Sequence, residues 1–142
     1  MKTPFSANQF TPTKWDTSED KAKFANQFLS FVESGFAQSK FPKWFYKRLS
    51  MTFGHIAHYD QGGFFAEFFQ TTGDKLRFLR QCSQHSCFGD PTYTYSDVER
   101  ALRDWMGRVS AVSMYEKMLR NENEKNERAE LARLKSKYEG VV

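Results

Sequence analysis

The sequence predicts an all-α protein, built as an irregular bundle of about five helices with a long C-terminal helix. Two observations favour this fold class: apolar residues recur at helical spacing in several segments, and the alternation typical of strands is nearly absent. The 142 residues suffice for one domain with its own core. Aromatic residues make up 17% of the chain and include 15 Phe, so few positions supply most of the apolar area of that core.

Three parts are expected along the chain. Residues 1–16 contain prolines and small polar residues, which is typical of an extended N-terminal arm. Residues 17–120 carry most of the apolar periodicity and form the helical domain. Residues 121–142 begin with a run that lacks apolar side chains, so they form a charged C-terminal tail that is either helical and exposed or frayed.

The first helix is expected to begin at Thr17, because Asp20 follows this hydroxyl by three residues and completes an approximate capping box. Apolar residues then recur at i, i+4, i+7 and i+8 as far as Val32, and Gly35 is a natural stop. In the arm before this helix, Trp15 and two Phe residues are expected to pin the chain to the domain.

Three shorter helices are expected next. The second begins near Pro42, which is well tolerated in a first turn, and ends near Gly54. A turn at residues 60–63 precedes a short and very apolar third helix. The fourth helix is capped by the hydroxyls that begin at Thr71, and it ends near Cys87.

One long helix is expected to follow a short connector. Ser96 and Glu99 match the Ser-x-x-Glu capping box, which is the clearest helix start in the chain. From Val98 to Leu119 apolar residues alternate at spacings of four and three, and Gly107 is only a weak point in this pattern. The sequence therefore predicts a single helix through this segment.

The location of the protein is expected to be cytoplasmic. The N-terminal residues lack the apolar run of a signal peptide, and no segment is long and apolar enough to span a bilayer. No membrane partner is expected. In such a compartment Cys82 and Cys87 are more typical of thiols than of a disulfide.

Basic side chains interleaved with aromatic rings are the main functional signal. The net charge is only +4, but a cluster of cations lies in a stretch without acids between Glu33 and Asp60. Cations that follow phosphates and rings that stack on bases together hold single-stranded nucleic acid, although many basic runs are only solvated helix faces. A second basic run lies farther along the chain. The candidate contact residues are Lys40, Lys43, Trp44, Lys47, Arg48, Lys75, Arg77 and Arg80.

Two other function classes are kept as alternatives. The first is a zinc- or thiol-dependent enzyme, since thiolates and imidazoles are the ligands that zinc prefers. Its residues would be His55, His58, Cys82, His85 and Cys87. No metal or other cofactor is expected, however, because the spacing is looser than that of a zinc knuckle and Cys82 falls on an apolar row. The second alternative is a homodimer, or a larger helical homo-oligomer, formed through residues 98–138.

Three short stretches carry a resemblance to known proteins. They are Phe-Gly-His-Ile-Ala-His-Tyr at residues 53–59, Gly-Asp-Pro at 89–91 and Asp-Val-Glu at 97–99. In these the chain resembles small, mostly uncharacterised accessory proteins of phages and mobile genetic elements, over residues 44–105. The resemblance assigns no site residue, and it implies an accessory role such as inhibition of a host defence nuclease complex. Together with the basic residues, it leads us to expect a non-enzymatic interaction protein that binds nucleic acid or a nucleoprotein, including a host protein.

Overall fold

The computed structural model describes residues 5–53, 60–85 and 89–140, and the described part is helical without any strand. The predicted all-α class is therefore confirmed for these residues. Six α-helices occur in the described ranges, with one short 3-10 helix before the first of them and another between the first and the second. Their bounds are η1 Ala7–Gln9, α1 Ser18–Glu33, η2 Gln38–Lys40, α2 Lys43–Phe53, α3 Gln61–Phe68, α4 Thr72–Ser83, α5 Ser96–Arg108 and α6 Ala111–Glu139.

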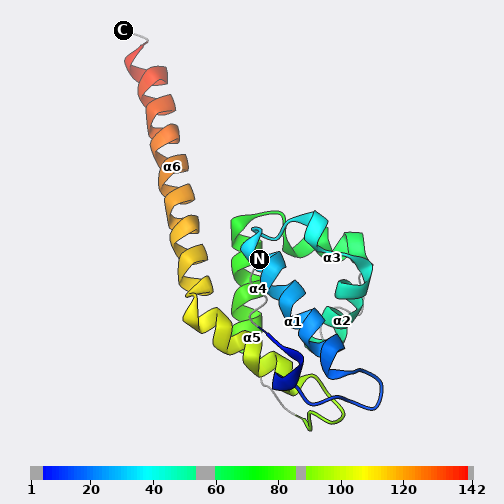
Figure 1. The fold of residues 1–142 in the computed structure, drawn as a ribbon. Helices are drawn as coiled ribbons and strands as arrows, with labels where there is room; N and C mark the ends of the chain where they lie inside the picture. The colour runs from blue at the N-terminus through cyan, green and yellow to red at the C-terminus, as the bar shows by residue number, and fades with distance from the viewer. Residues whose placement is uncertain (1–4, 54–59, 86–88, 141–142) are drawn as a thin grey trace.

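Helix α1 lies in the middle of the body (Figure 1). It contacts η1, η2, α2 and α5, while α4 packs against α3, α5 and α6. Aromatic rings also link α1 to α4, since the ring centres of Phe28 in α1 and Phe78 in α4 lie 6.2 Å apart. The bundle is thus irregular, with the longest helix at its edge.

The core is built from Phe rings, as the composition predicts. Phe31 lies at its centre, fully buried, with the ring centres of Phe36, Phe41 and Phe69 at 5.1, 5.1 and 4.9 Å. Phe36 adopts a left-handed conformation with φ of 63°, which is strained for a residue with a side chain. Its ring stacks on Phe69 at 5.3 Å, so burial offsets the strain of the turn that ends α1.

Two predicted helix starts, at Thr17 and Thr71, are confirmed by side-chain caps. Thr17 accepts a hydrogen bond from the Asp20 backbone N–H, and the Asp20 carboxylate accepts one in return from the Thr17 N–H. The Thr71 hydroxyl caps α4. The turn predicted at residues 60–63 is wrong, because α3 begins at Gln61 and the Asp60 carboxylate caps it by accepting from the Gly63 N–H. Helix α2 begins at Lys43, directly after Pro42. Each cap satisfies a backbone donor that a helix leaves unpaired at its N-terminus.

The capping box expected at the start of α5 does not form. The Ser96 hydroxyl donates instead to the backbone carbonyl of Gly89 at 2.9 Å, and the Glu99 carboxylate pairs with His85. Both side chains are buried. Their partners, Gly89 and His85, lie between α4 and α5, so neither side chain caps the helix. Helix α4 also ends at Ser83, several residues before the predicted end near Cys87.

The prediction of a single long helix from residue 96 onward is wrong, because the helix is interrupted between α5 and α6. Ser110 takes the left-handed conformation, with φ of 54°. Gly107 and the β-branched Val109 are weak helix formers just before the break. The change of direction brings Ala111 and Tyr115 into the core, where the Tyr115 ring meets Phe36 at 5.6 Å.

Helix α6 is 29 residues long and leaves the body after its first turns (Figure 1). Beyond Leu119 nearly all its side chains are exposed, and the segment that was expected to be helical or frayed is helical. Ion pairs at helical spacing line it, from Arg128 to Glu124 at 2.7 Å and from Arg133 to Glu130 at 2.6 Å. Neither this helix nor any other in the described ranges is long and apolar enough to cross a membrane.

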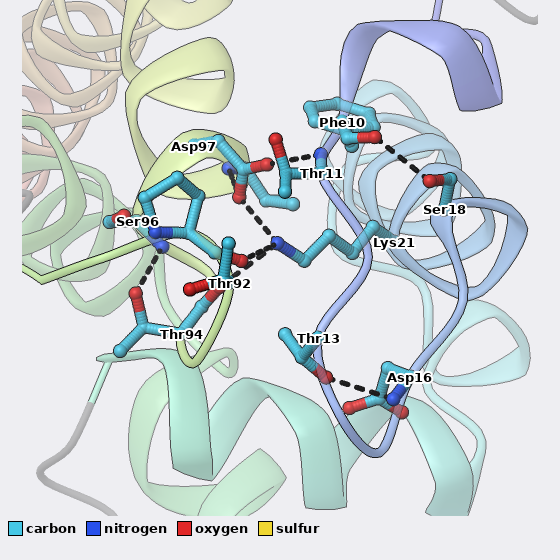
Figure 2. A network of polar contacts seen from close by, with 12 residues as sticks. Phe10, Thr11, Thr13, Asp16, Ser18, Lys21, Thr92, Thr94, Ser96 and Asp97 are labelled. Carbon is cyan, nitrogen blue, oxygen red and sulfur yellow. Dashed lines mark hydrogen bonds and ion pairs between the residues drawn. The ribbon is translucent and has the colours of Figure 1, made fainter.

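A buried cation joins α1 to the loop before α5 (Figure 2). The side chain of Lys21 has no exposed surface. Its ammonium group donates to the carbonyl oxygens of Pro91 and Thr94 at 2.8 and 2.9 Å, and to Asp97 Oδ1 at 2.9 Å. Asp97 Oδ2 in turn accepts from the backbone N–H of Thr11 at 2.9 Å. All three ammonium donors are therefore satisfied, which is what allows a charge to be buried.

Replacing Lys21 by Met should lower the free energy of unfolding by about 3–5 kcal/mol, since it leaves the Asp97 carboxylate and two carbonyl oxygens without their donor. Urea denaturation followed by tryptophan fluorescence measures this loss. The matched control is Lys14→Met, which changes an exposed lysine and should stay within about 0.5 kcal/mol. A loss below about 1 kcal/mol for Lys21→Met would contradict the assigned network.

Truncation after Asn123 should leave the body folded. The variant keeps the contact from the Thr72 hydroxyl to Glu122 and removes only the part of α6 whose side chains are nearly all exposed. The free energy of unfolding, measured by thermal denaturation at the wild-type midpoint temperature, should change by no more than about 0.5 kcal/mol. A large fall would show that Leu131, Leu134 or Tyr138 docks on the body or on a second copy, and light scattering separates these two outcomes.

Candidate nucleic-acid interface

Helix α2 displays most of the first predicted basic cluster. Lys43 and Lys47 are exposed and lie one helical turn apart, and Lys40 is exposed just before the helix, in η2. Lys40 and Lys43 make no ion pair with another described residue. Trp44, which lies between Lys43 and Lys47 in the sequence, keeps 38% of its surface exposed. Lys43, Trp44 and Lys47 are therefore exposed at neighbouring positions of one helix.

Arg48 differs from the other residues of the cluster because its charge is directed into the body. Its side chain is only 24% exposed, and Nη2 lies 2.9 Å from Asp16 Oδ1. The guanidinium group also lies over the Tyr95 ring, 4.7 Å from its centre. The Arg48 side chain is thus held in place and its charge is partly neutralised, whereas the lysines are exposed to solvent.

A pocket of about 250 Å³ opens beside Trp44. Lys23 of α1 reaches over the indole ring, with its ammonium 4.4 Å from the ring centre. Its lining combines aromatic rings, two cationic side chains and two carboxylates. The lining residues are Asp16, Asp20, Lys23, Phe24, Trp44, Arg48 and Tyr95.

The electrostatics of the pocket are balanced rather than purely basic. Two acids, Asp16 and Asp20, face two cations, Lys23 and Arg48. Burial raises the pKa of Tyr95 to about 12, against the opposing effect of Arg48. The phenol therefore stays neutral, and the pocket presents an uncharged ring between charged groups.

The sequence did not single out five of these lining residues. Asp20, Lys23 and Phe24 lie at i, i+3 and i+4 of α1, a spacing that places them on one helical face. That spacing was the available signal, but it does not reveal that α2 lies opposite. Asp16 comes from the loop before α1 and Tyr95 from the loop before α5, so only the tertiary fold brings these two residues to the same pocket.

The loop before α1 carries a further exposed ring. Trp15, which was expected to pin the arm, is 71% exposed, whereas Phe5 and Phe10 are buried. Its neighbour Asp16 lines the pocket. The prediction for Trp15 is therefore wrong, because the sequence alone did not separate the core aromatics from the exposed ones.

The second basic run lies on a different helix from the first cluster. Lys75, Arg77 and Arg80 lie on α4, which packs against α3, α5 and α6, whereas α2 packs against α1. Arg77 lies 3.7 Å from Asp74 and covers the Phe68 ring. Arg80 pairs with Glu116 of α6 at 2.8 Å. Acids thus offset much of the charge of this run.

The His and Cys residues proposed as an enzyme or zinc site fall only partly within the described residues. His55, His58 and Cys87 lie outside them. Cys82 is buried, 2% exposed, and burial raises the pKa of its thiol well above its ordinary value. His85 Nε2 lies 2.9 Å from Glu99 Oε1, and burial raises the pKa of that carboxyl while His85 opposes the shift. The described part of the chain contains no group of three or more residues able to hold a metal ion.

No protein-family model, curated protein sequence or solved structure matches this chain. The surface around Trp44 is therefore interpreted from its own chemistry. Exposed lysines, an indole ring and an adjoining pocket occur together there, and this combination is typical of surfaces that hold single-stranded nucleic acid.

Cys82 should not react as a catalytic thiol. In a Cys87→Ser variant, an aromatic disulfide reagent at neutral pH should modify Cys82 only after unfolding, because a buried thiol with a raised pKa forms little thiolate. Absorbance of the released thiol follows the reaction with and without denaturant. Fast modification of the folded variant would instead support the thiol alternative.

Proposed function

We propose that this chain is a small, non-enzymatic interaction protein that binds nucleic acid or a nucleoprotein. The contact surface consists of Lys40, Lys43, Trp44 and Lys47, with the adjoining pocket at its edge. We call this set the α2 surface. The observation that carries the proposal is the indole of Trp44, partly exposed between lysines and backed by a further cation, Lys23.

Electrostatics favour a polyanionic partner for the α2 surface. Lys43 and Lys47 lie one turn apart, so they project from the same side of the helix and can follow successive phosphates. The sequence between Glu33 and Asp60 contains no acid that would offset them locally. Arg48 is paired with Asp16, so the proposal assigns it a positioning role rather than a phosphate contact.

Stacking on Trp44 would add a contribution that a purely basic helix face lacks. A cation over an exposed aromatic ring is worth about 0.5–1 kcal/mol. A base stacked on such a ring contributes about 1–3 kcal/mol. A base can therefore displace the Lys23 ammonium from the indole at a net gain, and that ammonium then becomes available to a phosphate.

The biological setting is a narrower proposal and rests on the resemblance to accessory proteins of phages and mobile elements. In that setting the partner is a host defence nuclease complex in the cytoplasm, and the α2 surface blocks or occupies its nucleic-acid-binding site. A homodimer through residues 98–138 stays an alternative, since α6 projects with Leu131 and Tyr138 exposed. Affinity purification from the native cell, with and without nuclease, separates a nucleic-acid partner from a protein partner.

The Lys43→Glu, Lys47→Glu variant should bind labelled single-stranded nucleic acid much more weakly than the wild type. If both lysines contact phosphates, the slope of log affinity against log salt should fall by about 1.4 for a single strand. Fluorescence anisotropy at several salt concentrations measures both effects. Stability should change by no more than about 0.5 kcal/mol, because both side chains are exposed.

The matched control is Lys135→Glu, Lys137→Glu, which makes the same change in net charge on the projecting part of α6. This variant should keep the wild-type salt slope. Equal losses in the two double variants would indicate a nonspecific effect of net charge. Salt-independent binding, or unchanged binding by the α2 variant, would refute the proposed surface.

A further inference from the structure

We propose that the pocket beside Trp44 takes in one unpaired base of a bound strand, and that it prefers guanine. This inference rests on the proposed function, because the strand must first lie on the α2 surface. It adds a preference for single strands over duplexes and a base-reading residue, Asp20. The ligand class is single-stranded nucleic acid that contains an accessible guanine.

The placement of the pocket along α2 fits a base rather than a phosphate. Successive residues of a helix are rotated by about 100°, so the lysine pair and the pair formed by Trp44 and Arg48 occupy adjoining strips. Lys43 and Lys47 form the outer strip, while Trp44 and Arg48 line the pocket toward α1. A strand whose phosphates follow the lysines therefore has the pocket directly beside its bases.

The size and the walls of the pocket suit a single ring system. Sites for drug-sized ligands are about 300–1,000 Å³, and this pocket is about 250 Å³. Trp44 supplies a partly exposed aromatic ring, and Tyr95, beneath the Arg48 guanidinium, also lines the pocket. Flat aromatic and guanidinium surfaces are the groups on which unstacked bases are held.

The two carboxylates that line the pocket offer hydrogen-bond acceptors. Asp20 Oδ2 accepts from the Thr17 backbone N–H at 2.9 Å, and Oδ1 has no hydrogen-bond donor among the described residues. Asp16 Oδ1 is taken by Arg48, and its Oδ2 likewise has no donor within the described ranges. An ionised carboxylate only accepts hydrogen bonds, so these atoms select a base edge that donates.

Guanine is the base whose Watson–Crick edge fits such a carboxylate best. Its N1–H and its N2 amino group are adjacent donors, whereas cytosine and adenine offer one amino group beside a ring acceptor. Thymine and uracil place a carbonyl oxygen on each side of their single N–H, and these oxygens would face the carboxylate. In a duplex this edge is already paired, so the pocket requires a single strand.

The test compares labelled oligothymidines of about 12 nucleotides that carry one central dG, dC or dA, or dT throughout. Wild-type protein should bind the dG strand roughly tenfold more tightly than the all-dT strand, with dC and dA between them. In Asp20→Asn this ratio should fall to about one, because the amide places a donor where the guanine edge also donates. Asn keeps a carbonyl oxygen for the Thr17 N–H, and thermal unfolding checks that the fold is intact.

The matched control is Glu19→Gln, which removes a neighbouring exposed carboxylate that is not part of the pocket and should keep the tenfold preference. Equal affinity of the wild type for all four strands would overturn the base-reading role and leave the proposed function standing. A preference that survives in Asp20→Asn would overturn the role of that residue. Absence of binding to every strand, and to a duplex of matched length, would also overturn the proposed binding of nucleic acid by the α2 surface.

Discussion

The structure depends on one buried cation, the ammonium group of Lys21. Isolated charges are costly to bury, but this one has three donors directed to three acceptors, from Pro91, Thr94 and Asp97. Asp97 also binds the backbone of Thr11, so a single ion pair holds the N-terminal segment, α1 and the start of α5 together (Figure 2). The Phe core supplies apolar area, but the ion pair fixes how the loops lie on it, because its geometry is directional.

The same contacts build the proposed binding pocket. Lys21 fixes the carbonyl of Thr94, and the next residue, Tyr95, has its ring 5.3 Å from that ammonium. The Tyr95 ring also lies beneath the Arg48 guanidinium and makes a T-shaped contact with Phe24, with ring centres 5.8 Å apart. A wall that is held from inside the core needs no ordering when a ligand binds, which lowers the entropic cost of recognition. The lysines of the α2 surface need no such support, since they act through charge.

Local sequence patterns predicted the parts of the fold that are decided locally. The capping box of Thr17 and the apolar row up to Val32 depend on neighbouring residues, and both were placed correctly. Ser96 and Glu99 form the same sequence pattern, yet their side chains bind Gly89 and His85 instead of capping the helix. The left-handed Ser110 was missed for a similar reason, because burial of Tyr115 against the body offsets a local cost that the sequence reveals only in part.

The candidate surface was predictable to a comparable degree. Exposed lysines around Trp44 follow from helical spacing, whereas the pairing of Arg48 with Asp16 joins residues 32 positions apart and leaves no local signal. Lys21 is the extreme case, since a lysine in an early helical turn is ordinarily exposed. Only the fold shows that its partners lie 70 or more residues away.

The most direct measurement is a nitrogen-15 NMR spectrum selective for lysine ammonium groups, with the Lys21 signal assigned through its own side-chain carbons. A fully buried and hydrogen-bonded ammonium should exchange its protons with water slowly and give a sharp signal at neutral pH. Exposed groups such as that of Lys14 should be broadened by exchange. A protected Lys21 signal is expected, and a Lys21 signal that exchanges as fast as that of Lys14 would contradict the buried ion pair.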